Sequence, residues 1–314
     1  MDEDLIKKLV ILWRNKGETP NELYELANLI NEKQNRTNKF LDSIDVCGTG
    51  GDKTNTFNIS TLAAIVASSC GAKVIKHSGR STTSITGSVD ILNQFGFEFN
   101  DRSCLKQEEY FLKTGLMFTS SKLLRELFGD VKKVCKKLDI PGFVNLLGPL
   151  TNPYETSFQL LGVSSIKWGD LISETLRLNT LNKPNVEGLV VCCEISENQF
   201  LDELSFCGLN HIWKVKKGEI KKDIVKPQDF SVEICDLSSL IISNQNEAKT
   251  IFEGVLKGNS SENLKAKVIA LNVGAILSLV KQVESIQEGY KVALEYIKTG
   301  KSWEHFQGFI NCNK

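Results

Sequence analysis

A glycine-rich segment between Asp45 and Asp52 holds the first residues suited to chemistry. Gly48, Gly50 and Gly51 fall within four positions after a predicted strand. Glycine permits a positive φ and a close backbone approach, so several N–H groups can point at one anion. The spacing matches neither the P-loop nor the dinucleotide-binding fingerprint, and a plain turn between a strand and a helix is the alternative. The segment predicts a phosphate cradle.

A helix start follows this segment directly, at Asn58, Ser60 and Thr61. Residues of these types commonly serve as N-caps, which is their simplest role. The N-terminus of a helix also attracts phosphate, and hydroxyl oxygens can bind a hard cation. The short distance along the chain favours one anion site made by the glycine segment and the helix start together.

A third polar segment runs from Lys76 to Asp90, after another predicted strand. Runs of serine and threonine are usually solvated loops. Here Lys76 and Arg80 accompany the hydroxyls, and the carboxyl ends of parallel strands are where α/β sheets bind ligands. The combination favours a site for a phosphate or another oxyanion.

An adjacent pair of acidic residues, Asp202 and Glu203, is the fourth feature. Such pairs are common on protein surfaces. In a loop, both side chains can also reach Mg²⁺ ions that bind a pyrophosphate. His211 and His305 have no evident ligand partners in the sequence, and we interpret both as structural.

The elements around these segments alternate between strand and helix. Apolar runs bounded by Gly71 and Gly96 give the order strand, loop, helix, strand, loop, helix, which is typical of parallel βα units. Residues 1–34 predict helices, with a capping box from Thr19 to Glu22 and a linker at 31–39. The remaining predicted elements are strands at 43–47, 72–76, 188–194 and 211–215, a hairpin turn at 216–219, and helices at 60–67, 88–95, 266–280 and 286–299.

Composition narrows the class of protein. Lys+Arg and Asp+Glu are equal at 38 each, which disfavours a nucleic-acid partner. The nine cysteines lack CxxC spacing, so reduced thiols are expected rather than a disulfide scaffold or zinc site. No apolar run reaches the roughly 18 residues of a membrane span, and the N-terminus does not resemble a signal peptide. We expect a soluble, cytoplasmic protein without a membrane partner.

Together and in this order, the segments resemble the anthranilate phosphoribosyltransferase family. The similarity extends from Lys16–Pro20 through the three segments above to Asn145–Pro153, Leu201–Leu204 and the closing helices. It implies an α/β fold in which a small helical domain is hinged to a larger α/β domain with a mainly parallel central sheet. The expected boundaries are 1–41, joined by helices from about 120–145, and 42–314.

The resemblance also implies an activity. The family transfers a phosphoribosyl group from phosphoribosyl pyrophosphate to anthranilate, a small aromatic amine, with Mg²⁺ as cofactor, in tryptophan biosynthesis. Lys76, Asp202 and Glu203 are the implied catalytic residues, and Ser60, Asp202 and Glu203 the implied metal ligands. No dedicated base is expected, because the lone pair of an aromatic amine is already available and positioning can suffice. The implied substrate-binding residues are Gly48, Gly51, Asp52, Thr56, Asn58, Ile59, Ser60, Thr61, Lys76, His77, Ser78, Gly79, Arg80, Thr83, Ser84 and Ser88.

The sequence departs from the family pattern on the acceptor side. The family motif Lys-His-Gly-Asn-Arg, whose Asn contacts anthranilate, carries Gly79 at that position. The Arg that binds the anthranilate carboxylate aligns with Cys135, so the implied acceptor site is Gly48, Gly79 and Cys135. The candidates to replace the Arg are Lys132, Lys133, Lys136 and Lys137. The chain also begins close to the family's third helix, so we expect it to lack part of the helical domain that the family uses for dimer contacts. The oligomeric state, including a homodimer, therefore stays open on the sequence.

Other functions stay open on the sequence alone. The same donor chemistry could serve a different aromatic amine or a nitrogen heterocycle. A non-catalytic paralogue that binds a ligand or nucleic acid is a second alternative, which the neutral net charge and the acidic pair disfavour. A nucleoside phosphorylase of the same general fold is the third, and the acidic pair and glycine segment argue for a pyrophosphate donor instead.

Overall fold

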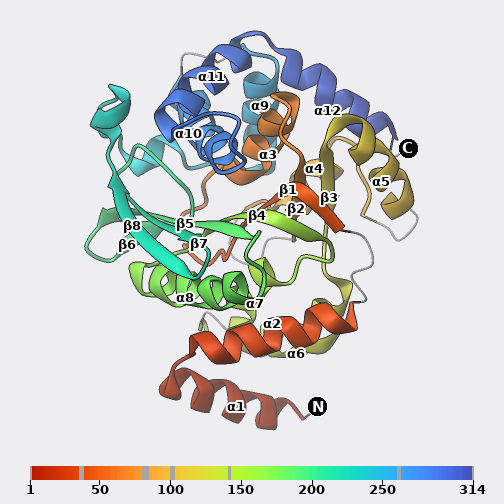
Figure 1. The fold of residues 1–314 in the computed structure, drawn as a ribbon, viewed down its shortest axis with the longest axis vertical. Coiled ribbons are helices and arrows are strands. Elements are labelled where there is room, and N and C mark those ends of the chain that lie inside the picture. Colours follow the sequence, from red (N-terminus) through yellow and green to blue (C-terminus); the bar gives the residue numbers. More distant parts are fainter. Residues whose placement is uncertain are drawn as a thin grey trace.

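One sheet of eight strands organises the described part of the chain, which comprises residues 2–34, 39–79, 85–99, 103–140, 143–259 and 263–312 of a computed structural model (Figure 1). The strand order is β3-β2-β1-β4-β5-β7-β8, with β6 beside β5. The strands are β1 (Lys39–Gly48), β2 (Val74–His77), β3 (Leu116–Thr119), β4 (Glu155–Gly162), β5 (Glu187–Ser196), β6 (Gln199–Leu201), β7 (Leu209–Lys216) and β8 (Glu219–Val225).

The sheet is mainly parallel, as predicted. Strands β3, β2, β1, β4 and β5 run parallel, whereas β6, β7 and β8 add an antiparallel edge. The predicted hairpin turn joins β7 to β8, where Lys217 and Gly218 have φ values of 49° and 78°. Positive φ at both central residues matches the right-handed twist of the flanking strands. The fold class predicted from the sequence is confirmed.

One face of the sheet is covered by helices from the C-terminal half together with α3, α4 and α5 (Figure 1). Helix α10 is apolar on nearly every side, as expected for a helix enclosed by neighbours, and it packs between α11 and α3. The elements of this layer are α3 (Ile59–Ser69), α4 (Ser88–Asn93), α5 (Ser103–Thr114), α9 (Gln245–Leu256), α10 (Leu264–Leu279), α11 (Ile286–Lys298) and α12 (Lys301–Cys312).

The other face carries α7 (Phe143–Leu147) and α8 (Ile166–Asn182), with α1 (Glu3–Lys16), α2 (Pro20–Lys33) and α6 (Lys122–Lys137) outside them (Figure 1). The predicted capping box starts α2: Glu22 N donates to Thr19 Oγ1 at 3.4 Å, and Thr19 N donates to Glu22 Oε2 at 3.1 Å. Helix α6, within the expected range 120–145, packs against α1. Short 3₁₀ turns lie at Gly148–Leu150, Pro227–Phe230 and Leu237–Ser239.

The predicted linker at 31–39 was placed wrongly at both ends. Helix α2 continues to Lys33, and β1 already begins at Lys39. Two polar residues at the start of this range make tertiary contacts: Asn31 Nδ2 donates to Leu150 O at 3.1 Å, and Gln34 Nε2 donates to Thr151 O at 3.3 Å. Among the described residues, no helix is both long and apolar enough to cross a bilayer.

Candidate active site

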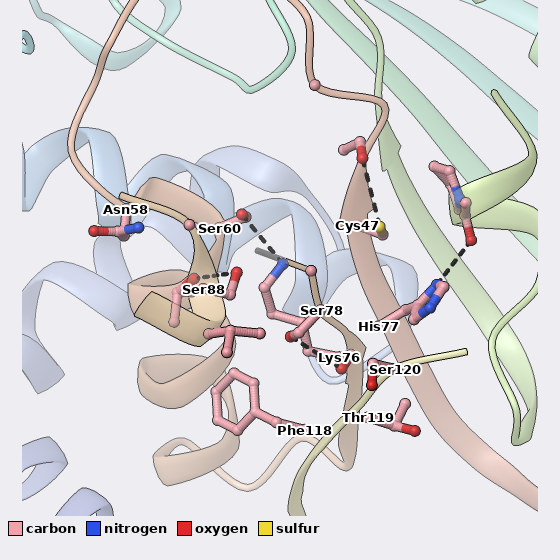
Figure 2. A pocket seen from close by; sticks show the side chains of 18 of the residues that line it. Cys47, Asn58, Ser60, Lys76, His77, Ser78, Ser88, Phe118, Thr119 and Ser120 are labelled. Atoms are coloured by element: carbon pink, nitrogen blue, oxygen red, sulfur yellow. Dashed lines mark hydrogen bonds between the residues drawn. The ribbon is translucent and has the colours of Figure 1, made fainter. Parts of the chain in front are cut away.

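A cavity of about 1210 Å³ opens at the carboxyl ends of β1 and β2. Its walls are the glycine turn after β1, the start of α3, the end of β2 and the inner side of α6 and α7. Figure 2 shows Lys76 and Ser60 pointing toward each other on one wall of a pocket, with His77, Thr119 and Ser120 nearby. This is the edge at which a parallel sheet presents its loops to a ligand.

The glycine turn after β1 contacts an acidic residue from the far half of the chain. Gly50 and Gly51 have φ values of 63° and 87°, a left-handed conformation that favours glycine. Gly50 N donates to Asp202 Oδ2 at 2.8 Å. A Cβ at Gly48 would collide with the Asp202 carboxylate, and one at Gly162 would collide with the Asp202 backbone. Gly48, Gly50 and Gly162 together therefore fix the position of Asp202.

The start of α3 contacts the second acidic residue. Ser60 N donates to Glu203 Oε1 at 2.9 Å, so the positive end of the helix faces a carboxylate. Lys76 is only 2% exposed, and its Nζ donates to Ser60 Oγ at 3.2 Å and to Val46 O at 2.8 Å. The four segments singled out in the sequence thus meet at one wall of the cavity.

This wall carries more negative than positive charge. Burial and, to a smaller extent, the negative charge of Asp52 raise the pKa of Asp202 to about 7. Burial also raises the pKa of Glu203 well above its usual range, with Asp202 and Asp52 adding to the effect. Lys76 lowers both values without removing the excess. A divalent cation at this wall would relieve the repulsion.

The donor set fits a hard cation such as Mg²⁺. It offers the carboxylates of Asp202 and Glu203 and the hydroxyl of Ser60, all of them oxygen ligands. Within the described ranges, no cluster of three or more His, Cys, Asp or Glu side chains is arranged to enclose a metal. Water and phosphate oxygens would have to complete the coordination, which is the usual arrangement for Mg²⁺. The Asn58 Oδ1 atom adds a buried acceptor without a hydrogen-bond partner in the structure.

His77 connects two loops that border the cavity. Its Nδ1 lies 2.7 Å from Gly148 O, and Ser121 N donates to its Nε2 at 3.0 Å. A carbonyl on one side and an N–H on the other select the neutral tautomer with the proton on Nδ1. Because both ring nitrogens bind protein groups, His77 joins β2 to the loops before α6 and after α7 instead of offering a free nitrogen to a ligand.

Most of the predicted site residues line the cavity. Ile59 does not: its side chain is fully buried in the core, and its N–H donates to Phe57 O at 2.7 Å. Arg80, Thr83 and Ser84 lie outside the described residues. The lining residues that were predicted are Gly48, Gly51, Asp52, Thr56, Asn58, Ser60, Thr61, Lys76, His77, Ser78, Gly79, Ser88, Asp202 and Glu203.

Comparison with known proteins identifies the relatives of this chain. The model of the glycosyl transferase family, α/β domain, matches residues 41–303. An anthranilate phosphoribosyltransferase of Chloroherpeton thalassium is 32% identical over 309 residues, covering 98% of this chain and 88% of the relative. The chain belongs to the anthranilate phosphoribosyltransferase family.

Solved structures of this family share the fold. The Thermus thermophilus anthranilate phosphoribosyltransferase has a TM-score of 0.85 at 27% identity, covering 100% of this chain and 91% of the other. The Saccharomyces cerevisiae enzyme, in complex with phosphoribosyl pyrophosphate and Mg, has a TM-score of 0.79 at 28% identity, covering 94% and 80%. Another structure of the yeast enzyme contains 4-fluoroanthranilate, with a TM-score of 0.77 at 26% identity and the same coverage.

The acceptor-site assignment of Cys135 is wrong for this member of the family. Cys135 is 5% exposed and packs with Ile6, Val10 and Val134, because α1 covers the last turns of α6. Its neighbour one helical turn earlier, Lys132, lines the cavity instead, and partial burial lowers its pKa. Of the other lysines considered, Lys133 forms an ion pair with Asp130 at 2.9 Å and Lys137 one with Glu3 at 2.6 Å.

Several lining residues were missed in the sequence. The end of β3 and the loop after it contribute Thr119, Ser120 and Ser121, and α6 contributes Arg125 and Phe128. The signal for α6 was its strong amphipathic pattern: one face packs on the protein, and its N-cap Ser121 accepts from Leu124 N at 3.0 Å. That pattern predicts a helix but does not indicate which face borders a cavity.

Proposed function

We propose that this protein transfers the phosphoribosyl group of phosphoribosyl pyrophosphate to anthranilate and releases pyrophosphate, as a step of tryptophan biosynthesis. The observation that carries the proposal is the convergence of the glycine turn, the start of α3, Lys76 and the Asp202–Glu203 pair on one cavity. The membership of the chain in the anthranilate phosphoribosyltransferase family and the ligands named for the yeast structures support the same reaction.

We call the wall formed by the glycine turn, the start of α3, Lys76 and the Asp202–Glu203 pair the donor wall. Its residues act on different parts of the sugar pyrophosphate. Lys76 places a buried cation where negative charge grows on the departing pyrophosphate, which is a preorganised electrostatic contribution. The N-terminus of α3 and the backbone of the glycine turn orient phosphate groups. Asp202 and Glu203, with the Ser60 hydroxyl, would hold Mg²⁺. When bound, Mg²⁺ would neutralise the pyrophosphate charge as a Lewis acid.

The acceptor side of the cavity is formed by α6, α7 and the end of β2. No residue on this side needs to act as a base, because the aromatic amine already presents its lone pair. Among the cations of α6 that line the cavity, we assign Lys132 to the acceptor carboxylate, because it lies one helical turn before the position that aligns with the family's Arg. We also propose the division into residues 1–41 with α6 and residues 42–314 as domains, since α6 faces the donor wall across the cavity.

The direct test is pyrophosphate release from phosphoribosyl pyrophosphate and Mg²⁺ in the presence of anthranilate, with a panel of other aromatic amines and nitrogen heterocycles beside it. Turnover with anthranilate supports the proposal. Turnover with another amine and none with anthranilate would replace the acceptor but keep the donor chemistry. Absence of Mg²⁺-dependent binding of phosphoribosyl pyrophosphate in titration calorimetry would remove the transferase function altogether.

Replacing Lys132 by Gln should raise the KM for anthranilate about tenfold, the size of one charge-assisted hydrogen bond. The KM for phosphoribosyl pyrophosphate should not change, because Lys132 lies on α6 and not on the donor wall. Lys133→Gln is the matched control, since Lys133 pairs with Asp130 on the exposed side of α6. Equal effects of the two variants on the anthranilate KM would contradict the assignment.

Restoring the family's amide with Gly79→Asn should lower the KM for anthranilate by about three- to tenfold, the value of a neutral hydrogen bond. Gly79 lines the cavity, and a Cβ there would meet no atom of the described residues within 4 Å. Gly79→Ala adds the Cβ without the amide and should leave the KM unchanged. Steady-state kinetics with varied anthranilate measures both, and a higher KM in the Asn variant would contradict this placement of the acceptor.

A further inference from the structure

Outside the cavity, cysteines from distant parts of the chain meet in the core. Cys207 follows the Asp202–Glu203 loop, and Cys235 lies in the segment before the last 3₁₀ turn. Their Sγ atoms are 3.1 Å apart, although 28 residues separate them in the sequence. Cys193 of β5 lies close enough for its charge to interact with that of Cys235. All three thiols are free.

The geometry of this group does not suit a metal. Three thiols in proximity would be the beginning of a zinc site, yet among the described residues no such group is arranged to hold an ion. The two closest sulfurs instead share a hydrogen bond. A pair of thiols in this arrangement is suited to oxidation.

The two thiols differ in exposure and in acidity. Cys207 is 3% exposed, whereas Cys235 is partly exposed to solvent. The hydrogen bond with Cys207 lowers the pKa of Cys235 to about 7, and the same hydrogen bond together with burial raises the pKa of Cys207. The thiolate is the reactive form of cysteine, so the reachable sulfur is also the nucleophilic one.

We propose that Cys207 and Cys235 are a redox modification site, at which a peroxide converts the two thiols into a reversible disulfide. Cys235 reacts first, and Cys207 resolves the intermediate. The placement of the two residues carries this assignment of roles: Cys207 is buried, and Cys235 is partly exposed with its Sγ 3.1 Å from that of Cys207.

The chemistry balances with one equivalent of peroxide. The Cys235 thiolate attacks one peroxide oxygen, the O–O bond breaks, and water or an alcohol leaves with the proton of the thiol. This yields a sulfenic acid on Cys235. The Cys207 sulfur then attacks the Cys235 sulfur and displaces water, forming the S–S bond. Two thiols are oxidised by two electrons, and the peroxide is reduced by two.

The disulfide would join the loop that carries Asp202 and Glu203 to a segment that pairs with the chain just before α3, which lines the candidate active site. The loop of Cys207 carries Asp202 and Glu203, and the Asn272 side chain holds it by accepting from Leu204 N at 3.2 Å and donating to Leu204 O at 2.8 Å. The segment of Cys235 continues into a pairing with the chain before α3, where Phe57 N donates to Leu240 O at 3.1 Å. We therefore expect oxidation to raise Tm and to leave the Asp202–Glu203 loop in place.

Peptide mapping of the full-length protein tests the proposal. After graded hydrogen peroxide and alkylation of free thiols, cleavage after glutamate places Cys207 in peptide 204–219 and Cys235 in peptide 234–247, separate from Cys192 and Cys193. The expected product is the cross-linked pair of these two peptides, with a Tm several degrees higher that returns to its starting value after dithiothreitol. A cross-link from Cys235 to Cys193 instead, or none before other thiols are overoxidised, would overturn the proposal.

Two single variants assign the roles of the cysteines. In Cys207→Ser, dimedone should trap a sulfenic acid on Cys235 after peroxide, because the thiol proposed to resolve it has been removed. In Cys235→Ser, Cys207 should stay reduced at the same dose. Cys312→Ser is the control, since Cys312 is exposed near the C-terminus. This variant should form the disulfide between Cys207 and Cys235 at the wild-type rate. Trapping on Cys207 in the second variant would contradict the assignment.

Discussion

The double variant Asp202→Asn with Glu203→Gln is expected to lower kcat/KM for phosphoribosyl transfer by about a thousandfold or more. The amides keep the shape of both side chains but remove the negative charge that would hold Mg²⁺ against the pyrophosphate. The hydrogen bonds from Gly50 N and Ser60 N to these side chains can persist, because an amide oxygen also accepts. Initial rates of pyrophosphate release at saturating Mg²⁺ measure the effect.

Stability in the absence of metal is the control for folding in this variant. The folded protein holds the pKa of Asp202 at about 7, above its value of 3.8 outside the fold, and raises that of Glu203 as well. The folded state therefore binds more protons than the unfolded one between about pH 4 and pH 7, and stability falls as pH rises through this window. The double variant lacks this loss, so its Tm at pH 8 should match or exceed that of the wild type. A large drop in Tm would mean that lost activity reflects a damaged fold, and retained activity would refute the metal assignment.

Lys76→Met is expected to lower kcat/KM by about a hundredfold, with the loss mainly in kcat. Methionine fills most of the buried space but removes the cation that faces the departing pyrophosphate. It also leaves Val46 O and Ser60 Oγ without their donor, so some loss of stability should accompany the kinetic effect. Steady-state kinetics with both substrates varied separates the two parameters.

The matched control is Lys73→Met, which removes an exposed lysine paired with Asp42 just before the same strand. That variant should keep wild-type kcat and KM values. Lys76→Arg should recover little activity, because a planar guanidinium does not fit the space of the ammonium between α3 and β1. Wild-type kcat in Lys76→Met would show that the charge of Lys76 is not used in the reaction.

Local patterns predicted three strands of the parallel part of the sheet, β1, β2 and β5, but not β3 or β4. The strands predicted at 43–47 and 72–76 are short apolar runs ended by polar or glycine residues. The first lies within β1, and the second overlaps β2. The helix starts at Ser60 and Ser88 were visible from their small polar residues, and the capping box at Thr19 was read directly from its spacing. Each of these signals spans fewer than ten residues, which is why the sequence alone carries them.

Contacts between distant segments could not be predicted in the same way. Gly50 and Asp202 are 152 residues apart, and only the sheet order brings β6 and its loop to the end of β1. Cys135 was misassigned because a shift of three residues on α6 exchanges the cavity side for the contact with α1. The structural role of His77 depends on a carbonyl group and an N–H group from two other segments of the chain. No local motif indicates these contacts.

The glycines around Asp202 bear on how this site can be engineered. Gly48 and Gly162 lie on neighbouring strands, and an added Cβ would displace the Asp202 carboxylate at Gly48 and the Asp202 backbone at Gly162. Saturation libraries at these two positions should therefore yield almost no active clones. Positions on α6 that border the same cavity are free of this restriction. Attempts to broaden the range of accepted amines are therefore best confined to that helix, leaving the strand ends as they are.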